Sequence, residues 1–459
     1  MKATLLVAFL GSSLLAAAGA CAQPNNANPE SLALAQSAVA ELQSRVSAYD
    51  MSLVEPLSAL ADQQMRFGEF QLAYRTLDRA MQTVRINQGL FTQAQHPLLH
   101  KKIDNLVGQG NWEDARAQLA HLVYLYSREQ QIVSQELLDG IMKLSDAHLR
   151  GISKDSYDYQ GFHFSRVSAS NRVALSIGEA LWGEQDPRLV PLIYRILSQF
   201  SLEYAAISFN GRTGIEIRTV VPGTNWIREV SEMRQYYLLV GTELIARLRS
   251  VYSSETAFDE EAVAMADLYL ADWLNLFNQN EAALAAYRQA YENLLAANVE
   301  TRIIDQFFAT PRILPEPQFF TSLSHAIEGQ AAAISPEHSS VEPESGAHVQ
   351  LFFSEWSEGF PYVQQPVNLI EAGINSAEFA IFTFNIGGYP DVERLLQGRN
   401  PLGLGVVENL TALTKLPDSG YQKRKLLERV GSLRFRPKLV GGIPHETDAT
   451  LIYALAASY

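Results

Sequence analysis

Two segments of the chain, residues 57–85 and 101–128, carry the same pattern of glycine, aromatic and alanine residues. In each segment an apolar stretch ends at a glycine, an aromatic residue follows two positions later, and an alanine follows five positions later. The matching positions are Gly68 with Gly110, Phe70 with Trp112, and Ala73 with Ala115. Apolar residues on either side of the glycine recur at helical spacing, so each segment is predicted to form two helices joined by a turn.

The alanine after each turn has a small side chain, which allows the two helices of a pair to approach closely. Further along the second helix, Leu77 with Ala80 and Leu119 with Leu122 would face the next pair. A single pair cannot bury this apolar face, so the pattern favours stacked pairs. An ordinary helical bundle with alanines at its crossings remains the alternative.

A third segment, residues 266–294, repeats the second-helix positions with Ala283, Tyr287 and Ala290, but Asn278 stands at the turn in place of glycine. With these offsets the three segments resemble the tetratricopeptide repeat family. The first two segments lack the large aromatic residue that the family usually has in its first helix. The resemblance implies a solenoid of helix pairs that holds a partner protein or peptide in its groove, with Gln64, Asn105 and Trp273 of the first helices facing the groove.

The chain of 459 residues is long enough for two or three domains, and 47% of its residues are hydrophobic, as in a globular protein. Its net charge is −14, which argues against a general nucleic-acid-binding protein because such proteins display basic surfaces. Residues 377–459 carry a net charge of +2 and the preceding part carries −16. An acidic body therefore precedes a mildly basic end.

Residues 1–22 have the features of a secretory signal peptide: Lys2, an apolar core from Leu5 to Ala18, and small residues after it. The core is too short to span a bilayer, so no transmembrane span is predicted. Cys21 follows Ala18, Gly19 and Ala20, which resembles a bacterial lipoprotein box with alanine in place of the usual leucine. Cleavage after Ala22 is the alternative. Both routes predict a periplasmic protein, either soluble or tethered to the outer membrane through a lipid anchor on Cys21.

Between these ends, residues 30–150 are predicted to form the repeat-like helices, and residues 151–326 to form further helices with the third pair. The aromatic stretch 150–170 is expected to be a loop. Residues 205–224 alternate around Asn210 and predict an inserted β-hairpin, and a long helix is expected from Trp226 to Val251. Residues 327–376 begin with a segment rich in Pro, Ser and Glu, and are predicted to be a linker.

Residues 377–459 predict strands with one helix. A strand at 378–385 is followed by a glycine turn, a second strand at 389–397, a helix at 421–431, and two strands joined at Gly441 and Gly442. The order of elements and the positions of Gly388, Phe435 and Pro437 resemble the C-terminal domain of the TonB family, although residues 397–419 are longer than the family's usual connection. The predicted fold is thus an all-α helical-repeat solenoid followed by a small α+β domain of ββαβ type.

The resemblance to TonB implies a periplasmic protein-binding domain, in which a free sheet edge captures an extended peptide. Energy transfer by that family also requires an uncleaved membrane helix and a long proline-rich spacer, which this sequence lacks. Arg434, Arg436 and Lys438 alternate along one predicted strand and would share a face, because successive side chains of a strand point to opposite sides. That face is either a contact for an anionic partner or simply solvated.

No phosphate loop, dinucleotide fingerprint, Gly-x-Ser-x-Gly elbow or His-Glu-x-x-His motif occurs in the sequence. His96 and His100 lie four residues apart with no obvious third ligand, so no metal or other cofactor is predicted. A non-catalytic envelope protein that binds or scaffolds partners is the preferred interpretation. The alternatives are a periplasmic hydrolase or carbohydrate-active protein with a cleft near Tyr157 to Phe164 and Asn210, and an accessory component of a TonB-type uptake system.

Overall fold

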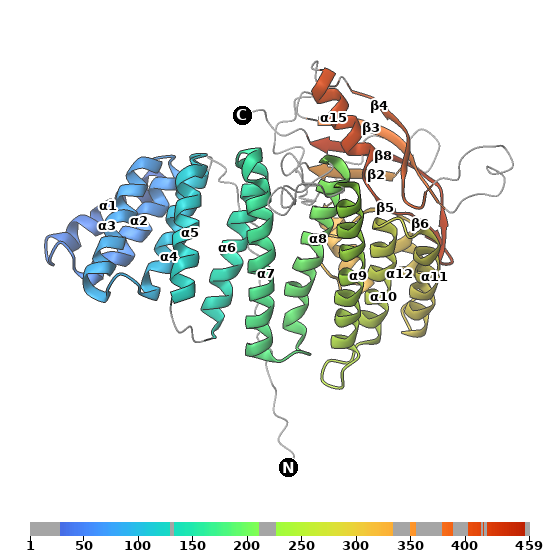
Figure 1. Ribbon diagram of the computed structural model, residues 1–459, viewed down its shortest axis with the longest axis horizontal. Coiled ribbons are helices and arrows are strands. Elements are labelled where there is room, and N and C mark those ends of the chain that lie inside the picture. Colours follow the sequence, from blue (N-terminus) through green and yellow to red (C-terminus); the bar gives the residue numbers. More distant parts are fainter. Residues whose placement is uncertain are drawn as a thin grey trace, which may run out of the picture. The chain divides into compact units, whose positions relative to one another are not determined.

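The computed structural model describes residues 28–128, 133–210, 226–333, 349–354, 379–388, 403–414, 416 and 420–454 (Figure 1). The chain divides into two compact units, residues 1–130 and residues 131–459. Each unit is described separately below. None of the described helices combines the length and the apolar character that crossing a bilayer requires.

The first unit is helical, and neighbouring helices in the sequence pack against each other. Its helices are α1 (Pro29–Gln43), α2 (Val54–Arg66), α3 (Phe70–Gln88), α4 (His96–Gly108) and α5 (Trp112–Arg128), with short 3₁₀ turns at Met51–Leu53 and Gln93–Gln95. The two predicted helix pairs are therefore α2 with α3 and α4 with α5.

The second unit continues with helices that again pack in sequence order from α6 to α11. They are α6 (Gln135–Lys154), α7 (Gln160–Trp182), α8 (Val190–Asn210), α9 (Trp226–Tyr252), α10 (Glu260–Leu276), α11 (Asn280–Ala296), α12 (Thr301–Phe308) and α13 (Leu323–Ala333), with 3₁₀ turns at Tyr157–Tyr159 and Pro187–Leu189. The third predicted pair is α10 with α11.

The three pairs share one turn geometry. Gly68, Gly110 and Asn278 have positive φ angles of 72°, 71° and 62°, a conformation that glycine adopts freely and asparagine tolerates. One residue later, the backbone N–H donates back to a carbonyl of the first helix at 2.8, 2.9 and 2.8 Å in the three turns. This is the Schellman arrangement, which ends the first helix and reverses the chain.

The second helices of the three pairs are also buried to the same extent at equivalent positions. All nine residues at these positions are between 0% and 1% exposed: Ala73, Leu77, Ala80, Ala115, Leu119, Leu122, Ala283, Tyr287 and Ala290. The small residues stand where the helices cross closely and the larger residues fill the space between helices. The spacing in the sequence therefore predicted both the turns and the buried face.

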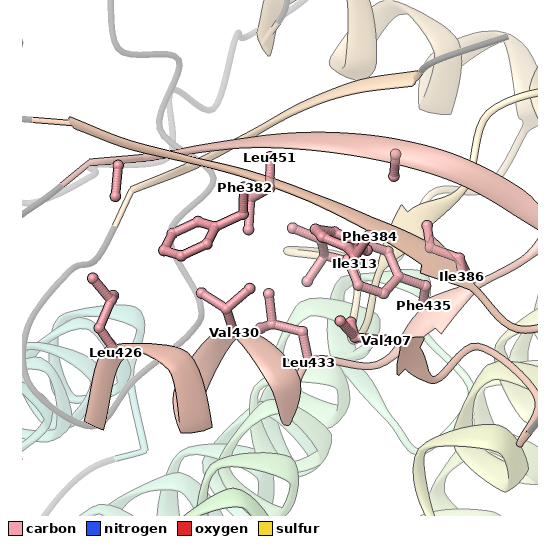
Figure 2. Packing of buried hydrophobic residues seen from close by; sticks show 12 residues of the cluster. Ile313, Phe382, Phe384, Ile386, Val407, Leu426, Val430, Leu433, Phe435 and Leu451 are labelled. Carbon is pink, nitrogen blue, oxygen red and sulfur yellow. The ribbon is translucent and has the colours of Figure 1, made fainter. Parts of the chain in front are cut away.

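The second unit also contains a four-stranded sheet with strand order β2-β8-β3-β4. The strands are β2 (Val349–Ser354), β3 (Phe379–Ile386), β4 (Val407–Ala412) and β8 (Thr447–Ala454). Strand β3 is antiparallel to both β4 and β8, whereas β2 runs parallel to β8. Helix α15 (Gly420–Gly431) covers one face of this sheet, and its Leu426 and Val430 face Phe382 of β3 (Figure 2).

Two further strand pairs lie beside the sheet. Strand β5 (Phe435–Arg436) is antiparallel to β1 (Arg312–Ile313), and β6 (Lys438–Val440) is antiparallel to β7 (Ile443–His445). Ile313 and Phe435 belong to the same buried cluster as the side chains of β3 and α15 (Figure 2). Strand β1 lies between α12 and α13 in the sequence, so the core of the sheet region includes a residue from the helical part of the chain.

Several predicted boundaries differ from the structure. Residues 150–170, expected to be a loop, form the end of α6, a 3₁₀ turn and the start of α7. The first half of α7 was not recognised as a helix because its buried face carries polar residues such as Gln160, His163 and Asn171, so its apolar pattern is weak. In the predicted hairpin, residues 205–210 are the last residues of α8, and residues 211–224 lie outside the described residues.

The predicted linker 327–376 contains the last part of α13 and all of β2. The second strand of the C-terminal sheet is β4, at residues 407–412, whereas the predicted position 389–397 lies outside the described residues. The predicted pair of final strands is divided into three short strands, β5 to β7, and the longer β8, with Gly441 and Gly442 joining β6 to β7. The strand at 378–385 and the helix at 421–431 were predicted to within one residue of β3 and α15.

Candidate functional site

The three residues predicted to face a groove are buried instead. Gln64, Asn105 and Trp273 are 6%, 0% and 4% exposed. The Gln64 Oε1 atom accepts a hydrogen bond of 2.8 Å from the Thr76 hydroxyl, and the Asn105 amide donates to the Phe70 carbonyl at 3.0 Å. These side chains thus hold helices of the first unit together. The three side chains therefore do not line an exposed groove as predicted, because their helix faces are turned toward other helices.

Trp273 packs against α9. Its indole N–H donates to the Leu238 carbonyl at 3.2 Å, and a Cβ added at Gly241 would lie 2.1 to 2.4 Å from the indole ring. Only glycine at position 241 leaves room for the ring in this position. Trp273 is therefore a packing residue between α9 and α10.

The predicted basic face of Arg434, Arg436 and Lys438 does not exist as a common exposed surface. Arg436 is 1% exposed, Arg434 is half-buried and donates to the Asn278 side chain, and Lys438 is half-buried in β6. Phe435, on the opposite side of β5 from Arg436, is 0% exposed. Both sides of β5 are covered, because Phe435 enters the core of the sheet while Arg436 enters a cluster of helical side chains.

Arg436 is the centre of a buried ionic cluster. Its Nε and Nη2 atoms donate to the two carboxylate oxygens of Asp272 in α10 at 3.0 and 2.5 Å, and its Nη1 lies 3.2 Å from the Glu316 carboxylate. Arg312 of β1 also donates to Glu316, through Nε at 3.3 Å and Nη2 at 3.1 Å. Two guanidinium groups therefore face two carboxylates, and the formal charges of the cluster cancel.

Neutral polar groups complete this cluster. The Tyr287 hydroxyl of α11 donates to Asp272 at 2.8 Å, and the Asn275 amide donates to the Phe435 carbonyl at 2.8 Å. The Asn275 bond ties α10 to the backbone of β5 directly. Hydrogen bonds of this kind are needed when charges are removed from water, because the attraction between the ions alone does not offset the loss of hydration.

The pKa values in the cluster follow from burial and from these pairs. Burial raises the pKa of Asp272, against the opposing effect of Arg436. Burial acts on Glu316 in the same direction, but Arg312 and Arg436 outweigh it and lower the pKa of Glu316. The pKa of Arg436 is raised because Asp272 and Glu316 outweigh its burial. Both carboxylates are engaged by guanidinium groups, so neither is placed to act as a base toward a ligand.

A small cavity of about 20 Å³ lies beside the cluster and is lined by residues that include Tyr194, Tyr269, Trp273, Asp272 and Glu316. This volume matches a single water molecule and is far below the roughly 300 to 1,000 Å³ of small-molecule sites. The hydroxyl groups of Tyr194 and Tyr269 donate to the carbonyls of Glu316 and Gln318 at 2.5 and 2.6 Å. The arrangement supports a structural role for this region.

A second buried polar cluster lies where the sequence suggested a hydrolase cleft. His163 Nε2 is 2.9 Å from Asp155 Oδ2, and His163 Nδ1 is 2.9 Å from His148 Nδ1. With the Asp155 carboxylate as acceptor, His163 carries its proton on Nε2, so His148 donates from Nδ1. The two imidazole rings are 0% and 1% exposed, which leaves a substrate no access to them in the described structure.

Burial, together with the nearby His163 and Arg166, lowers the pKa of His148 to about 3. A Cβ added at Gly151 would lie 2.3 to 2.6 Å from the His163 ring, so glycine at 151 makes room for this ring. The sequence offered no signal for the cluster, because His148 and Asp155 belong to α6 and its C-terminal cap whereas His163 belongs to α7. By contrast, Asp272 stands between Ala271 and Trp273 in an apolar helix, and such an acid is a signal of a buried ion pair.

Among the described residues, no group of three or more His, Cys, Asp or Glu side chains could hold a metal ion. His96 and His100 both lie against Tyr126: His96 packs at 4.4 Å between ring centroids, and His100 Nε2 is 3.1 Å from the Tyr126 hydroxyl. Cys21 lies outside the described residues.

No protein-family model matches the sequence, and no curated protein matches it. Among solved structures, one similar chain is BtubC (BKLC) from P. vanneervenii, with 15% sequence identity and a TM-score of 0.36. The match covers 59% of this chain and 92% of that chain. A similarity at this level defines neither a family nor a function.

Proposed function

We propose that the protein is a non-catalytic component of the bacterial cell envelope that binds partner proteins through tetratricopeptide-like helix pairs. The observation that carries this proposal is the equivalence of the three pairs. Their turns share one backbone conformation and hydrogen bond, and their second helices bury the same positions. Units of this kind are typical of solenoids, whose extended surfaces bind proteins and peptides.

For the C-terminal region we propose a domain related to that of the TonB family. The order of β3, β4, α15 and β8, with α15 on one face of the sheet, supports this proposal. In this chain β5 is held against α10 by Arg436 and Asn275, so the domain is proposed to act together with the helices and not as a tethered module.

The alternative role in a TonB-type uptake system depends on an open sheet edge. Strand β4 is an outer strand of the sheet among the described residues. However, Asn409 in β4 has a positive φ of 53°, and the register between β3 and β4 shifts between Thr383 and Asn385. Irregularities of this kind at a sheet edge protect it against the addition of another strand. We therefore prefer the partner-binding role.

The envelope location rests on residues 1–22 and stays a proposal, because these residues lie outside the described part of the chain. Mass spectrometry of the N-terminus of the protein isolated from cells tests both processing routes. A diacylglyceryl group on Cys21 would establish the lipid anchor, and an N-terminus at Gln23 would establish the soluble form. An intact Met1 would contradict both.

Partner binding is tested by photo-crosslinking in living cells. A photoreactive amino acid replaces an exposed residue, either Glu113 or Ala120 of α5, or Lys423 of α15. We expect the same partner protein to crosslink at several of these positions. No crosslink is expected at Leu77, a buried residue that serves as the control. The proposal fails if no position yields a crosslinked protein, or if crosslinking is equal at exposed and buried positions.

Point substitutions are preferable to deletion of residues 377–459 in such experiments. Deletion removes Arg436 and leaves Asp272 buried without its guanidinium partner, so loss of binding could result from unfolding.

A further inference from the structure

A group of exposed side chains in the first unit has the composition of a protein-binding site. Leu90, Phe91 and Tyr124 are 62%, 47% and 40% exposed, and the exposed Arg128 lies beside the two aromatic residues. We call these four residues the aromatic patch. Leu90 and Phe91 follow Gly89, whose φ of 97° ends α3 and turns the chain outward, whereas Tyr124 and Arg128 are one turn apart in α5.

The patch is ordered by contacts among its own members. The rings of Phe91 and Tyr124 meet edge to face, with centroids 6.0 Å apart. The Arg128 guanidinium carbon lies 5.4 Å from the centroid of Phe91 and 5.3 Å from that of Tyr124. The guanidinium group is thus held by both rings. Because it is already oriented and partly shielded from water, it loses less entropy on binding a partner than a free arginine side chain would.

A second guanidinium group, that of Arg85, lies near the patch. Arg85 donates to the Gln95 side chain at 2.8 Å and lies 3.4 Å from His121 Nε2, and the His121 ring stacks on Tyr124. Burial lowers the pKa of His121, and the charges of Arg85 and Lys102 lower it further. In the described part of the chain, the recorded partners of Arg85 and Arg128 are amide, imidazole and aromatic groups, with no carboxylate among them.

We propose that the aromatic patch binds an acidic segment of a partner protein, one that places a carboxylate beside an apolar side chain. The carboxylate would pair with Arg128, and the apolar side chain would pack on Leu90, Phe91 and Tyr124. Among the described residues neither Arg85 nor Arg128 pairs with a carboxylate, which favours an anionic ligand at this place. Exposed Tyr, Phe and Arg together are the composition of interface hot spots. The inference rests on the proposed function, because it names the partner class and the surface involved.

The probe is a phage-displayed library of random peptides selected on the purified full-length protein. We expect the selected peptides to be enriched in Asp and Glu next to Leu, Phe or Trp. A selected peptide is then labelled with fluorescein, and its affinity is measured by anisotropy. We expect Arg128→Glu to weaken binding at least tenfold, and the double variant Phe91→Ser with Tyr124→Ser to weaken it to a similar extent.

The variant Arg128→Lys tests whether binding needs only the positive charge of Arg128 or also its planar guanidinium group. Lysine keeps the positive charge but lacks the planar group that stacks on two rings, so binding is expected between that of the wild type and that of Arg128→Glu. The matched controls are Leu72→Ser and Arg75→Glu, two exposed positions in the first turns of α3. At about 1.5 Å per residue they lie roughly 21 and 17 Å along the helix from Ile86, near the end of α3 that leads to Leu90 and Phe91. These controls are expected to bind as the wild type does.

Several results would overturn the inference: no enrichment of acidic peptides, equal binding to Arg128→Glu, or equal loss in the Arg75→Glu control. Two other occupants are tested with the same variants. Arg128-dependent binding to phosphatidylglycerol vesicles without peptide binding would assign the patch to a membrane surface, and Arg128-dependent self-association would assign it to a second copy. If photo-crosslinking to a partner persists in Arg128→Glu cells, the proposed function stands and this inference fails.

Discussion

Arg436 and Asp272 are 164 residues apart in the sequence, yet the Arg436 guanidinium group donates two hydrogen bonds to the Asp272 carboxylate at 3.0 and 2.5 Å. The side chain of Arg436 is 1% exposed and that of Asp272 is 7% exposed. This pair joins the strand β5 to the helix α10 in a place that water does not screen. It is one of the contacts that join the C-terminal sheet to the helices before it within one compact unit.

Replacing Arg436 with Met should destabilise the second unit by about 3 to 5 kcal/mol, because it leaves Asp272 as a buried charge without its partner. The expected result is a lower urea midpoint in an unfolding experiment followed by circular dichroism. Lys438→Met, two residues away at a half-buried position, is the control and should change the free energy of unfolding by no more than about 0.5 kcal/mol.

The double variant Arg436→Met with Asp272→Asn tests whether the two side chains act as a pair. Its loss of stability should be clearly smaller than the sum of the two single losses, because the uncompensated charge is gone. Additive losses would mean that the ion pair does not stabilise the unit in the way that its geometry indicates.

Because the three helix pairs bury the same positions, each should lose a similar amount of stability when a larger side chain replaces its buried alanine. Ala73→Leu, Ala115→Leu and Ala283→Leu each add a large side chain at a fully buried crossing and should each cost about 1 to 3 kcal/mol. Ala117→Leu, at an exposed position of the same helix as Ala115, should leave the thermal midpoint nearly unchanged. A tolerated leucine at one of the three sites would show that this pair is packed differently from the others.

Gly241→Ala should displace Trp273, since the new methyl group would lie 2.1 to 2.4 Å from the indole ring in its present position. The expected loss is roughly 1 to 3 kcal/mol, measured by urea unfolding. The smaller ring of Trp273→Phe should partly relieve the clash, so the double variant should be more stable than additivity predicts. Gly431→Ala, where the nearest neighbour of the added atom is Leu410 at 4.0 Å, provides the control.

His148 should make the stability of the second unit depend on pH. Its pKa is about 3 in the folded protein and about 6.5 in an unfolded chain, so between these values the unfolded state binds the extra proton. Stability should therefore be fully present above about pH 6.5 and decrease as the pH falls toward 3, by up to about 1.4 kcal/mol per pH unit from this residue.

The variant His148→Asn isolates this effect, because asparagine keeps an N–H donor near the position of Nδ1 and does not titrate. The free energy of unfolding, measured between pH 4.5 and 7.5, should show a smaller slope in His148→Asn than in the wild type. An unchanged slope would mean that groups other than His148 determine the acid sensitivity.

Local sequence patterns were sufficient for the elements whose apolar residues lie on one side. The glycine–aromatic–alanine spacing predicted the pairs α2 with α3 and α4 with α5, and the same spacing with Asn278 predicted α10 with α11. Helix α15 and strand β3 were predicted for the same reason, because each packs one face against the sheet core and leaves the other outside. The first half of α7 was missed because its buried side carries polar residues such as His163 and Asn171 in place of apolar ones.

The side-chain environments were decided by contacts between distant parts of the chain. The alternation of side chains along a strand correctly places Phe435 and Arg436 on opposite faces. It also predicts that Arg436 faces solvent, because a strand with one apolar face is normally covered on that face alone. In the tertiary structure α10 covers the second face, and Asp272 and Glu316 supply the charges that make burial of an arginine tolerable. The spacing of residues determined which segments become helices and strands, whereas the meeting of segments more than a hundred residues apart decided which of their charges remain available to a partner.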